Sequence, residues 1–464
     1  MHPQMPAAFF RSLPIRSAAR QRQRQNLHIK NPKKLVMNQK MDSGAELPPG
    51  EFAALLGLDW GDKRHAIALQ VRGADRIEFL ELEHSAESLH AWLDQLRERF
   101  AGQRVAVALE ASKGAIVAAL LEHSWLVIYP VHPATSRRFS MAFSPSGAKD
   151  DRPDAHTLLT ILRGHRERLR ALLPHEEATR RLGLLVEARR TMVDRRTLLS
   201  NQLTSLLKNY YPQALLLTGE KRSAALALDF LERWPELKSL QRALPQTLRR
   251  FYSAHAVRRP EAIATRLELV RTARPLTTDR ALCEVSILEM RVLVAEMRLL
   301  EKHIAQIEKT ISAAFHDHPE AELFAHLPGA GAALAPRLMV LFGEDRERWL
   351  SPAQMQTYYG IAPVIEKSGR QRWVHWRWNA PVFARQTLVE WAGVTVKFSA
   401  WAKAYYQQQR TRQKTHAVIL RSLAFKWLRI LWRCWKERKP YHEPTYLARL
   451  QQRNPALFAL IPTT

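Results

Sequence analysis

The chain has 464 residues, of which 46% are hydrophobic and 25% are charged, so a fibrous or wholly disordered protein is excluded. Its 71 Lys and Arg outnumber its 44 Asp and Glu by 27, and such an excess in a foldable chain indicates a polyanionic partner, most often nucleic acid. Two cysteines, Cys283 and Cys434, are too few for a disulfide framework or a cysteine-rich zinc site and fit a reducing cytosol, and no apolar run is long enough for a membrane-spanning helix.

The length predicts about three domains. We place them at residues 51–168, 169–318 and 319–440, between a basic tail at 1–50 and a second tail at 441–464. Residues 1–41 contain nine Lys or Arg, and no acid comes before Asp42. This segment is typical of a disordered basic arm or an organelle transit peptide, or else the true start is Met37 or Met41. We expect no fold for it.

Residues 51–168 show strands first and then strands alternating with helices. Strands are predicted to end near Asp59, to run from His65 to Val71, and to cover the segments "DRIEFLELE", "RVAVALEAS" and "WLVIYPV". Helices are predicted over "SAESLHAWLDQLRERF", over residues 113–123 and from "GAKDDRPDAHTLL" onward. This order predicts an α/β domain with ligands at the strand ends.

Four acids stand where such a domain binds ligands. Asp59 and Glu110 each end an apolar strand, and Asp151 and Asp154 share one face at the start of a helix. Carboxylates that converge on one cleft repel unless a cation lies between them, and oxygen ligands favour Mg²⁺ or Mn²⁺. Taken singly, Asp59 is equally well a turn residue, Glu110 a solvent-facing charge, and the Asp151–Asp154 pair a favourable charge in a first helical turn. The set, in this order, favours a two-metal phosphodiester chemistry.

The pattern of residues 169–318 predicts a helical connector. Apolar residues recur at heptad spacing in two segments, namely Leu185, Met192, Leu199 and Leu206 with Leu182, Leu203 and Tyr210, and then Met290, Leu293, Met297, Leu300, Ile304, Ile307 and Ile311. A heptad seam needs a partner helix, either in a second subunit or in an antiparallel hairpin of the same chain. The stretch 212–280 predicts helical insertions with no evident function.

Residues 319–440 predict a mostly helical domain with three polar features. Gly329 and Gly331 open a helix in a pattern like a helix–hairpin–helix, which binds phosphate, or they form a tight turn between packed helices. Ala362-Pro363 is followed by Ser368-Gly369, which taken alone predicts a turn. Lys367, Arg370 and Arg372 flank that serine and could hold a phosphate.

A basic and aromatic segment follows at residues 401–440. It holds eleven Lys or Arg and one acid, Glu437, with interleaved aromatic residues Trp401, Tyr405, Tyr406, Phe425, Trp427, Trp432 and Trp435. We expect most of the aromatic residues to pack in a core and the cations to face phosphate.

The segments "GLDWGDKRHAIAL", "ALEAS" and "KDDRPDA", together with the later Ser368-Gly369, resemble the insertion-sequence-110 type of transposase. The resemblance implies a ribonuclease H-like domain similar to Holliday-junction resolvases, with Asp59, Glu110, Asp151 and Asp154 as its metal-binding acids, and Ser368 as a nucleophile in a second domain. It also implies a long coiled-coil hairpin, an oligomer (a dimer or tetramer), and guidance by an RNA that the mobile element encodes. The chain departs from the family at Asp150, where an uncharged residue is usual, and at the tryptophan-rich "WVHWRWN".

These observations predict a Mg²⁺- or Mn²⁺-dependent DNA recombinase that acts on DNA in the bacterial cytoplasm, at the nucleoid. Two alternatives stay open: a junction nuclease that cuts without rejoining, and a non-catalytic nucleic-acid-binding relative. Four acids argue against the last, because pure binding would be better served without them.

Overall fold

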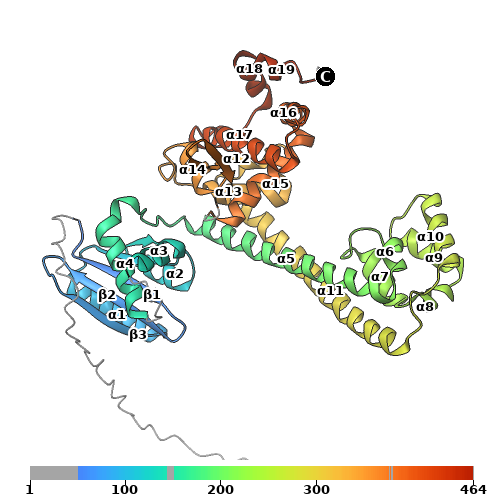
Figure 1. Cartoon of the computed structure of the whole chain (residues 1–464), viewed down its shortest axis with the longest axis horizontal. Coiled ribbons are helices and arrows are strands. Elements are labelled where there is room, and N and C mark those ends of the chain that lie inside the picture. Colours follow the sequence, from blue (N-terminus) through green and yellow to red (C-terminus); the bar gives the residue numbers. More distant parts are fainter. Residues whose placement is uncertain (1–50, 144–150, 376, 378–379, 463–464) are drawn as a thin grey trace, which may run out of the picture. The chain divides into compact units, whose positions relative to one another are not determined.

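A computed structural model of the chain describes residues 51–143, 151–375, 377 and 380–462, without the side chains of residues 143 and 151–153. The basic tail at 1–50 and Asp150 lie outside these residues. The chain divides into two compact units, one ending at Leu172 and the other beginning at Leu173 (Figure 1). None of the described helices is both long enough and apolar enough to cross a membrane.

The first unit is built on one five-stranded sheet. Its strands are β1 (Ala54–Trp60), β2 (Arg64–Val71), β3 (Ile77–Glu83), β4 (Val105–Leu109) and β5 (Leu126–Pro130). Their order in the sheet is β3-β2-β1-β4-β5. The first three strands are antiparallel to one another, whereas β4 is parallel to β1 and β5 is parallel to β4. The α/β prediction is confirmed, and this order agrees with the ribonuclease H-like fold.

Helices cover both faces of this sheet, because its strands alternate apolar residues toward each side. On one face, α1 (Ala86–Arg99) and α2 (Ala115–Leu121) pack with Leu56, Leu58, Val107 and Leu109. On the other face, α4 (Asp151–His165) packs with Leu55, Ala106 and Ala108. Helix α3 (Pro133–Phe143) and a short 3₁₀ turn, η1 (Arg166–Arg168), flank α4 along the chain.

The second unit contains two long antiparallel helices, α5 (Glu177–Tyr210) and α11 (Arg280–His316) (Figure 1). Ion pairs Arg189–Glu308 (2.6 Å) and Arg196–Glu301 (3.3 Å) fix their antiparallel register. The predicted seam residues are buried between them or in the flanking cores, among them Leu182, Leu199, Leu203, Met290, Met297, Ile304 and Ile311. The partner of the Met290–Ile311 seam is therefore α5 of the same chain, which is the hairpin alternative of the sequence analysis.

Five short helices follow α5 and precede α11. They are α6 (Gln213–Leu217), α7 (Ala225–Arg233), α8 (Leu237–Gln241), α9 (Pro245–Ala254) and α10 (Pro260–Thr272). They enclose a core of their own around Phe230, Trp234 and Tyr252, which packs against the adjoining ends of α5 and α11. The predicted helical insertions are thus one packed module at this end of the hairpin (Figure 1).

The remaining helices form a core at the other end of the hairpin. They are α12 (Ala321–Ala325), α13 (Gly331–Phe342), α14 (Pro352–Tyr358), α15 (Val382–Phe398), α16 (Ala400–Thr411), α17 (His416–Lys436), α18 (Glu443–Arg453) and α19 (Pro455–Phe458). Trp391, Trp401 and Trp427 are fully buried there, and Trp435 is 1% exposed. The expectation that most aromatic residues of 401–440 pack is confirmed. Residues 441–464, expected to be a tail, contribute Leu450 and Leu457 to the same core.

Two short strands project from this core between α14 and α15. They are β6 (Val364–Ser368) and β7 (Gln371–His375), and they pair antiparallel as a separate two-stranded sheet. Every residue from Ile365 to Val374 is exposed. We call residues 364–375 the β6–β7 ribbon.

Candidate catalytic site

Asp59 and Glu110 occupy equivalent positions on neighbouring strands. Leu58 of β1 is paired with Leu109 of the parallel strand β4, so the next residues, Asp59 and Glu110, follow at the same edge of the sheet. Paired strands are about 5 Å apart, so the two residues leave the sheet from adjacent positions. Asp59 is half-buried and Glu110 is exposed. The carboxyl ends of parallel strands are where this class of sheet binds ligands.

Helix α4 covers the side of the sheet that Asp59 faces. Gly57, two residues before Asp59, lies directly beneath α4: a Cβ built there would lie 2.1 Å from the Ala155 carbonyl oxygen and 2.6 Å from the Leu159 amide nitrogen. Residues two apart on a strand share a face, so Asp59 lies on the α4 side. Asp154 immediately precedes Ala155 in α4. The absence of a side chain at Gly57 therefore lets the first turns of α4, with Asp151 and Asp154, lie close to the carboxyl end of β1.

The described side chains do not themselves complete a metal site. Among them, no three Asp, Glu, His or Cys side chains lie close enough together to hold a metal ion. The side chain of Asp151, the first residue of α4, is outside that set. The structure thus places Asp59 and Glu110 at adjacent strand ends and Asp154 on the covering helix, and their convergence around a cation is a proposal.

The close contact at Gly57 yields a test of how the acids are positioned. Gly57→Ala should push α4 off the sheet, since its methyl group would meet backbone atoms that cannot rotate away, at a cost of about 3 kcal/mol in the free energy of local unfolding. Hydrogen exchange of the β1 and α4 amides in the full-length protein measures this cost. Gly164→Ala is the matched control on α4, because its Cβ meets nothing within 4 Å. Equal protection in the two variants would show that the contact does not hold α4 in place.

Ser368 is the last residue of β6 and lies at the tip of the β6–β7 ribbon. It pairs with Gln371, so Gly369 and Arg370 form a two-residue turn between the strands. Gly369 has a φ of +57°, a backbone conformation that two-residue hairpin turns need at their first position and that glycine adopts without strain. The turn predicted from Ser-Gly is confirmed. It holds the exposed Ser368 at the tip, where a large ligand can reach it.

Three cations lie next to Ser368 along the ribbon, with Lys367 and Arg372 on the face opposite to it. Lys367 precedes it and pairs across the ribbon with Arg372, while Arg370 is in the turn, and all three are exposed. The acid of this ribbon, Glu366, is in an ion pair of 2.8 Å with His375. The tip is therefore strongly cationic, and this charge favours a phosphate beside the serine.

Gly329 has a packing role. Its φ is +66°, and a Cβ there would lie 2.6 Å from Val394 and 2.5 Å from Phe398 of α15. Trp391 of α15 also donates a hydrogen bond to the Pro328 carbonyl oxygen at 3.0 Å. The turn between α12 and α13 is thus pressed against α15, as the packed-turn alternative expects. Gly331 begins α13 with φ +53° and open space beside it, so it remains the candidate for phosphate contact.

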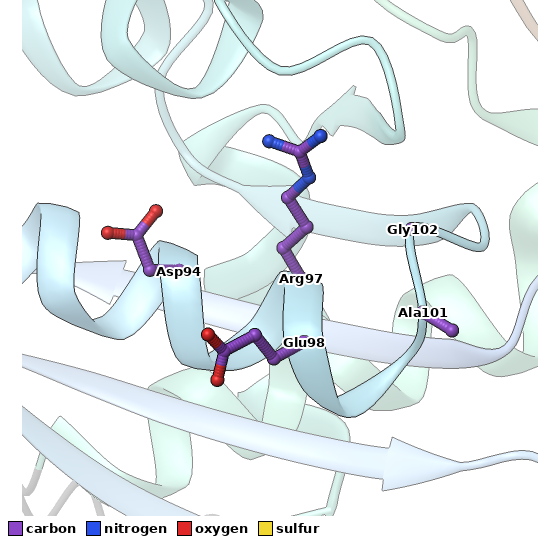
Figure 2. A pocket seen from close by; sticks show the side chains of 5 residues that line it. All are labelled: Asp94, Arg97, Glu98, Ala101 and Gly102. Carbon is purple, nitrogen blue, oxygen red and sulfur yellow. The ribbon is translucent and has the colours of Figure 1, made fainter.

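A surface hollow of about 490 Å³ lies elsewhere on the first unit. It is lined by Asp94, Arg97, Glu98, Ala101 and Gly102 at the end of α1 (Figure 2). The two carboxylates and the guanidinium in it point in different directions (Figure 2). Because α1 covers the face of the sheet opposite α4, this hollow is separate from Asp59 and its neighbours.

One feature of the candidate site was not singled out in the sequence, and a second was noted only as part of the tryptophan-rich segment "WVHWRWN". Gly57 is one, and its signal was a glycine inside an otherwise apolar strand, which often marks a close backbone approach. The other is Trp373, whose exposure on the ribbon no periodicity could reveal. The acids belong to the first unit and Ser368 belongs to the second.

Comparison with known proteins identifies the family. Residues 56–212 match the family model of the IS110-type DEDD transposases. Residues 321–407 match that of the transposases of the IS116/IS110/IS902 family. The chain belongs to the IS110 family of transposases. The first matched range includes all four acids, and the second includes Gly329, Gly331 and the β6–β7 ribbon.

Relatives of this IS110-type transposase extend the match along most of the chain. A Streptomyces coelicolor protein named as the mini-circle transposase for IS117 is 27% identical over 402 residues, covering 85% of this chain and 97% of the relative. An uncharacterized 43.6 kDa protein of insertion element IS110 from the same organism is 25% identical over 82% of this chain and 93% of its own length. An uncharacterized 42 kDa protein of insertion element IS900 from Mycobacterium paratuberculosis is 23% identical over 60% of this chain and 71% of its own length.

Proposed function

We propose that this transposase cleaves and rejoins DNA through a phosphoserine link at Ser368, with two divalent cations held by Asp59, Glu110, Asp151 and Asp154. One observation carries the proposal: Asp59 and Glu110 end neighbouring parallel strands beneath the helix that begins with the other two acids. Like charges at neighbouring strand ends repel one another, and a cation bound between them would offset that repulsion.

The donor set fits Mg²⁺ or Mn²⁺, since all four residues offer carboxylate oxygens. When bound, two such ions stabilise the attacking and leaving oxygens of a phosphodiester exchange. Glu110 is exposed, so it can turn toward a cation without unfolding its strand. Asp154 is on a helix whose position Gly57 fixes. Without bound cations, the four carboxylates would repel a DNA phosphate, and the cations would remove this repulsion.

Ser368 would act as the nucleophile. Its Oγ attacks phosphorus to form a Ser–O–P bond, the bond from phosphorus to the departing strand oxygen breaks, and that oxygen receives the serine proton. Rejoining reverses the step, because a strand hydroxyl attacks the phosphoserine and restores the free serine. The number of phosphodiester bonds is unchanged. Lys367, Arg370 and Arg372 would hold the phosphate, and Gly331 would contribute a backbone N–H at the start of α13.

We further propose that the active form is a homodimer or homotetramer guided by an element-encoded RNA. Helix α11 supports assembly, because a second apolar row lies on its surface: Val285, Leu288, Val292 and Leu299 are each 58% to 64% exposed. These residues continue the three–four spacing that a second copy of α11 would match. A sedimentation mass of one chain would contradict the oligomer. The net charge of +27 supports a large polyanion such as RNA with DNA.

The test of this function is a strand-exchange reaction with purified full-length protein and Mg²⁺. The substrates are DNA carrying the ends of the element and a target, with and without RNA copied from its noncoding flank. Joined recombinant DNA supports the proposal. Cut but unjoined DNA favours the junction-nuclease alternative, whereas binding without any cut strand favours the non-catalytic relative.

A further inference from the structure

The side of the β6–β7 ribbon that carries Ser368 also carries Trp373. Ser368 pairs with Gln371, and Glu366 pairs with Trp373. Residues two apart on a strand share a face, so Ser368, Glu366, Gln371 and Trp373 lie on one face of the ribbon. Trp373 is diagonal to Ser368, and diagonal neighbours on one face are within about 8 Å, in reach of an aromatic side chain.

Trp373 is exposed to solvent, whereas most of the described tryptophans of the second unit are buried. Its exposed fraction is 49%, whereas Trp349, Trp391, Trp401, Trp427 and Trp435 in the same unit are 0% to 2% exposed. Among the tryptophans of the described residues, it is the one that is exposed. The opposite face of the ribbon is exposed too, with Ile365 at 46% and Val374 at 57%. A two-stranded ribbon with both faces in water is only marginally stable by itself, so we expect a ligand to cover part of it.

The charged residues of the ribbon indicate which class of ligand would bind at Trp373. Arg370 is in the turn that directly follows Ser368, whereas Lys367 and Arg372 pair with each other on the opposite face of the ribbon. The Glu366 carboxylate is engaged by His375 at 2.8 Å. An exposed indole on a ribbon that also carries three exposed cations is the combination with which proteins bind single-stranded nucleic acid, since phosphates meet the cations and a base stacks on the ring. An acidic protein surface would use the cations and leave the indole without a partner of matching shape.

We propose that Trp373 is a stacking site for an unpaired nucleobase next to the phosphate held at Ser368. This inference rests on the proposed function for the identity of that phosphate. A base inside a duplex has both faces covered, so the ligand is a base that has left its stack, at a strand end or at the crossover of a branched DNA. The indole replaces the stacking lost there and orients the strand so that its phosphate meets the serine.

The test uses the full-length protein and a synthetic four-way DNA junction with 5-iododeoxyuridine at one crossover position at a time. Irradiation should crosslink one of these bases to the protein, and mass spectrometry should locate the link at Trp373. Trp373→Ala should lose this link and bind the junction about ten-fold more weakly, the usual cost of one stacked base. Trp373→Phe should retain most of the affinity, because a phenyl ring still stacks.

Val374→Ala is the matched control, as Val374 is adjacent in the strand, similarly exposed, and on the opposite face. It should bind like the wild type. Crosslinks that map elsewhere, unchanged affinity of Trp373→Ala, or an equal loss in Val374→Ala would overturn the stacking site. Ser368→Ala should keep the crosslink. If the wild-type protein crosslinked at Trp373 but never formed a covalent DNA link through Ser368, the stacking site would stand and the proposed nucleophile would be contradicted.

Discussion

Ser368→Ala should abolish the covalent protein–DNA link and with it the rejoined product. The alanine has no oxygen that could attack phosphorus, so the exchange should fall by at least about 1,000-fold, as when other enzymes lose a nucleophile. Ser368 is exposed at a hairpin tip, so the substitution removes no buried contact and the fold should be unchanged. Denaturing gel electrophoresis of protein trapped on end-labelled DNA measures the link directly.

Gln371→Ala is the matched control for this experiment. Gln371 is directly opposite Ser368 on the ribbon and equally exposed. Gln371→Ala should still form the link, and both variants should bind DNA like the wild type. A link that persists in Ser368→Ala would place the nucleophile at another residue.

Glu110→Gln should reduce strand cleavage by at least about 100-fold while DNA and RNA binding remain. The amide keeps the size of the side chain but loses the negative charge that a divalent cation needs, and even outer partners of metal ligands cost about 10- to 100-fold when they are changed. Because Glu110 is exposed, the free energy of unfolding should change little. Removing divalent cations with a chelator should stop cleavage by the wild type in the same way.

Glu122→Gln provides the control for charge. Glu122 directly follows α2, which covers the opposite face of the sheet, and it is also exposed. Its substitution changes the net charge by the same amount and should leave cleavage unaltered. Cleavage at the wild-type rate by Glu110→Gln would show that Glu110 holds no catalytic ion.

The order of strands and helices in the first unit could be predicted from sequence because the local pattern is unambiguous there. The apolar run before Asp59 and the run before Glu110 are short, bounded by polar turns, and buried on both faces, so each reads as a central strand. The sequence therefore predicted that Asp59 and Glu110 each end a central strand. That these two strands are parallel neighbours was shown by the structure.

Tertiary partners could not be predicted in this way. The seam from Met290 to Ile311 has the same spacing whether its partner is α5 or a second subunit, and the three-dimensional structure was needed to show α5. Residues 441–464 are polar enough to suggest a tail, yet Leu450 and Leu457 are buried against distant helices. The exposure of Trp373 depends on which described residues pack against the ribbon, and this is a property of the whole unit.

In the proposed function, the acids of the first unit and the serine of the second unit act in one reaction. The most direct measurement is the amino acid to which DNA is attached in a trapped reaction, identified by mass spectrometry of the digested adduct. We expect attachment at Ser368 in the wild type with Mg²⁺, and no adduct in Glu110→Gln or after chelation. Attachment at another residue, or an adduct at Ser368 that forms at the normal rate in Glu110→Gln, would contradict it.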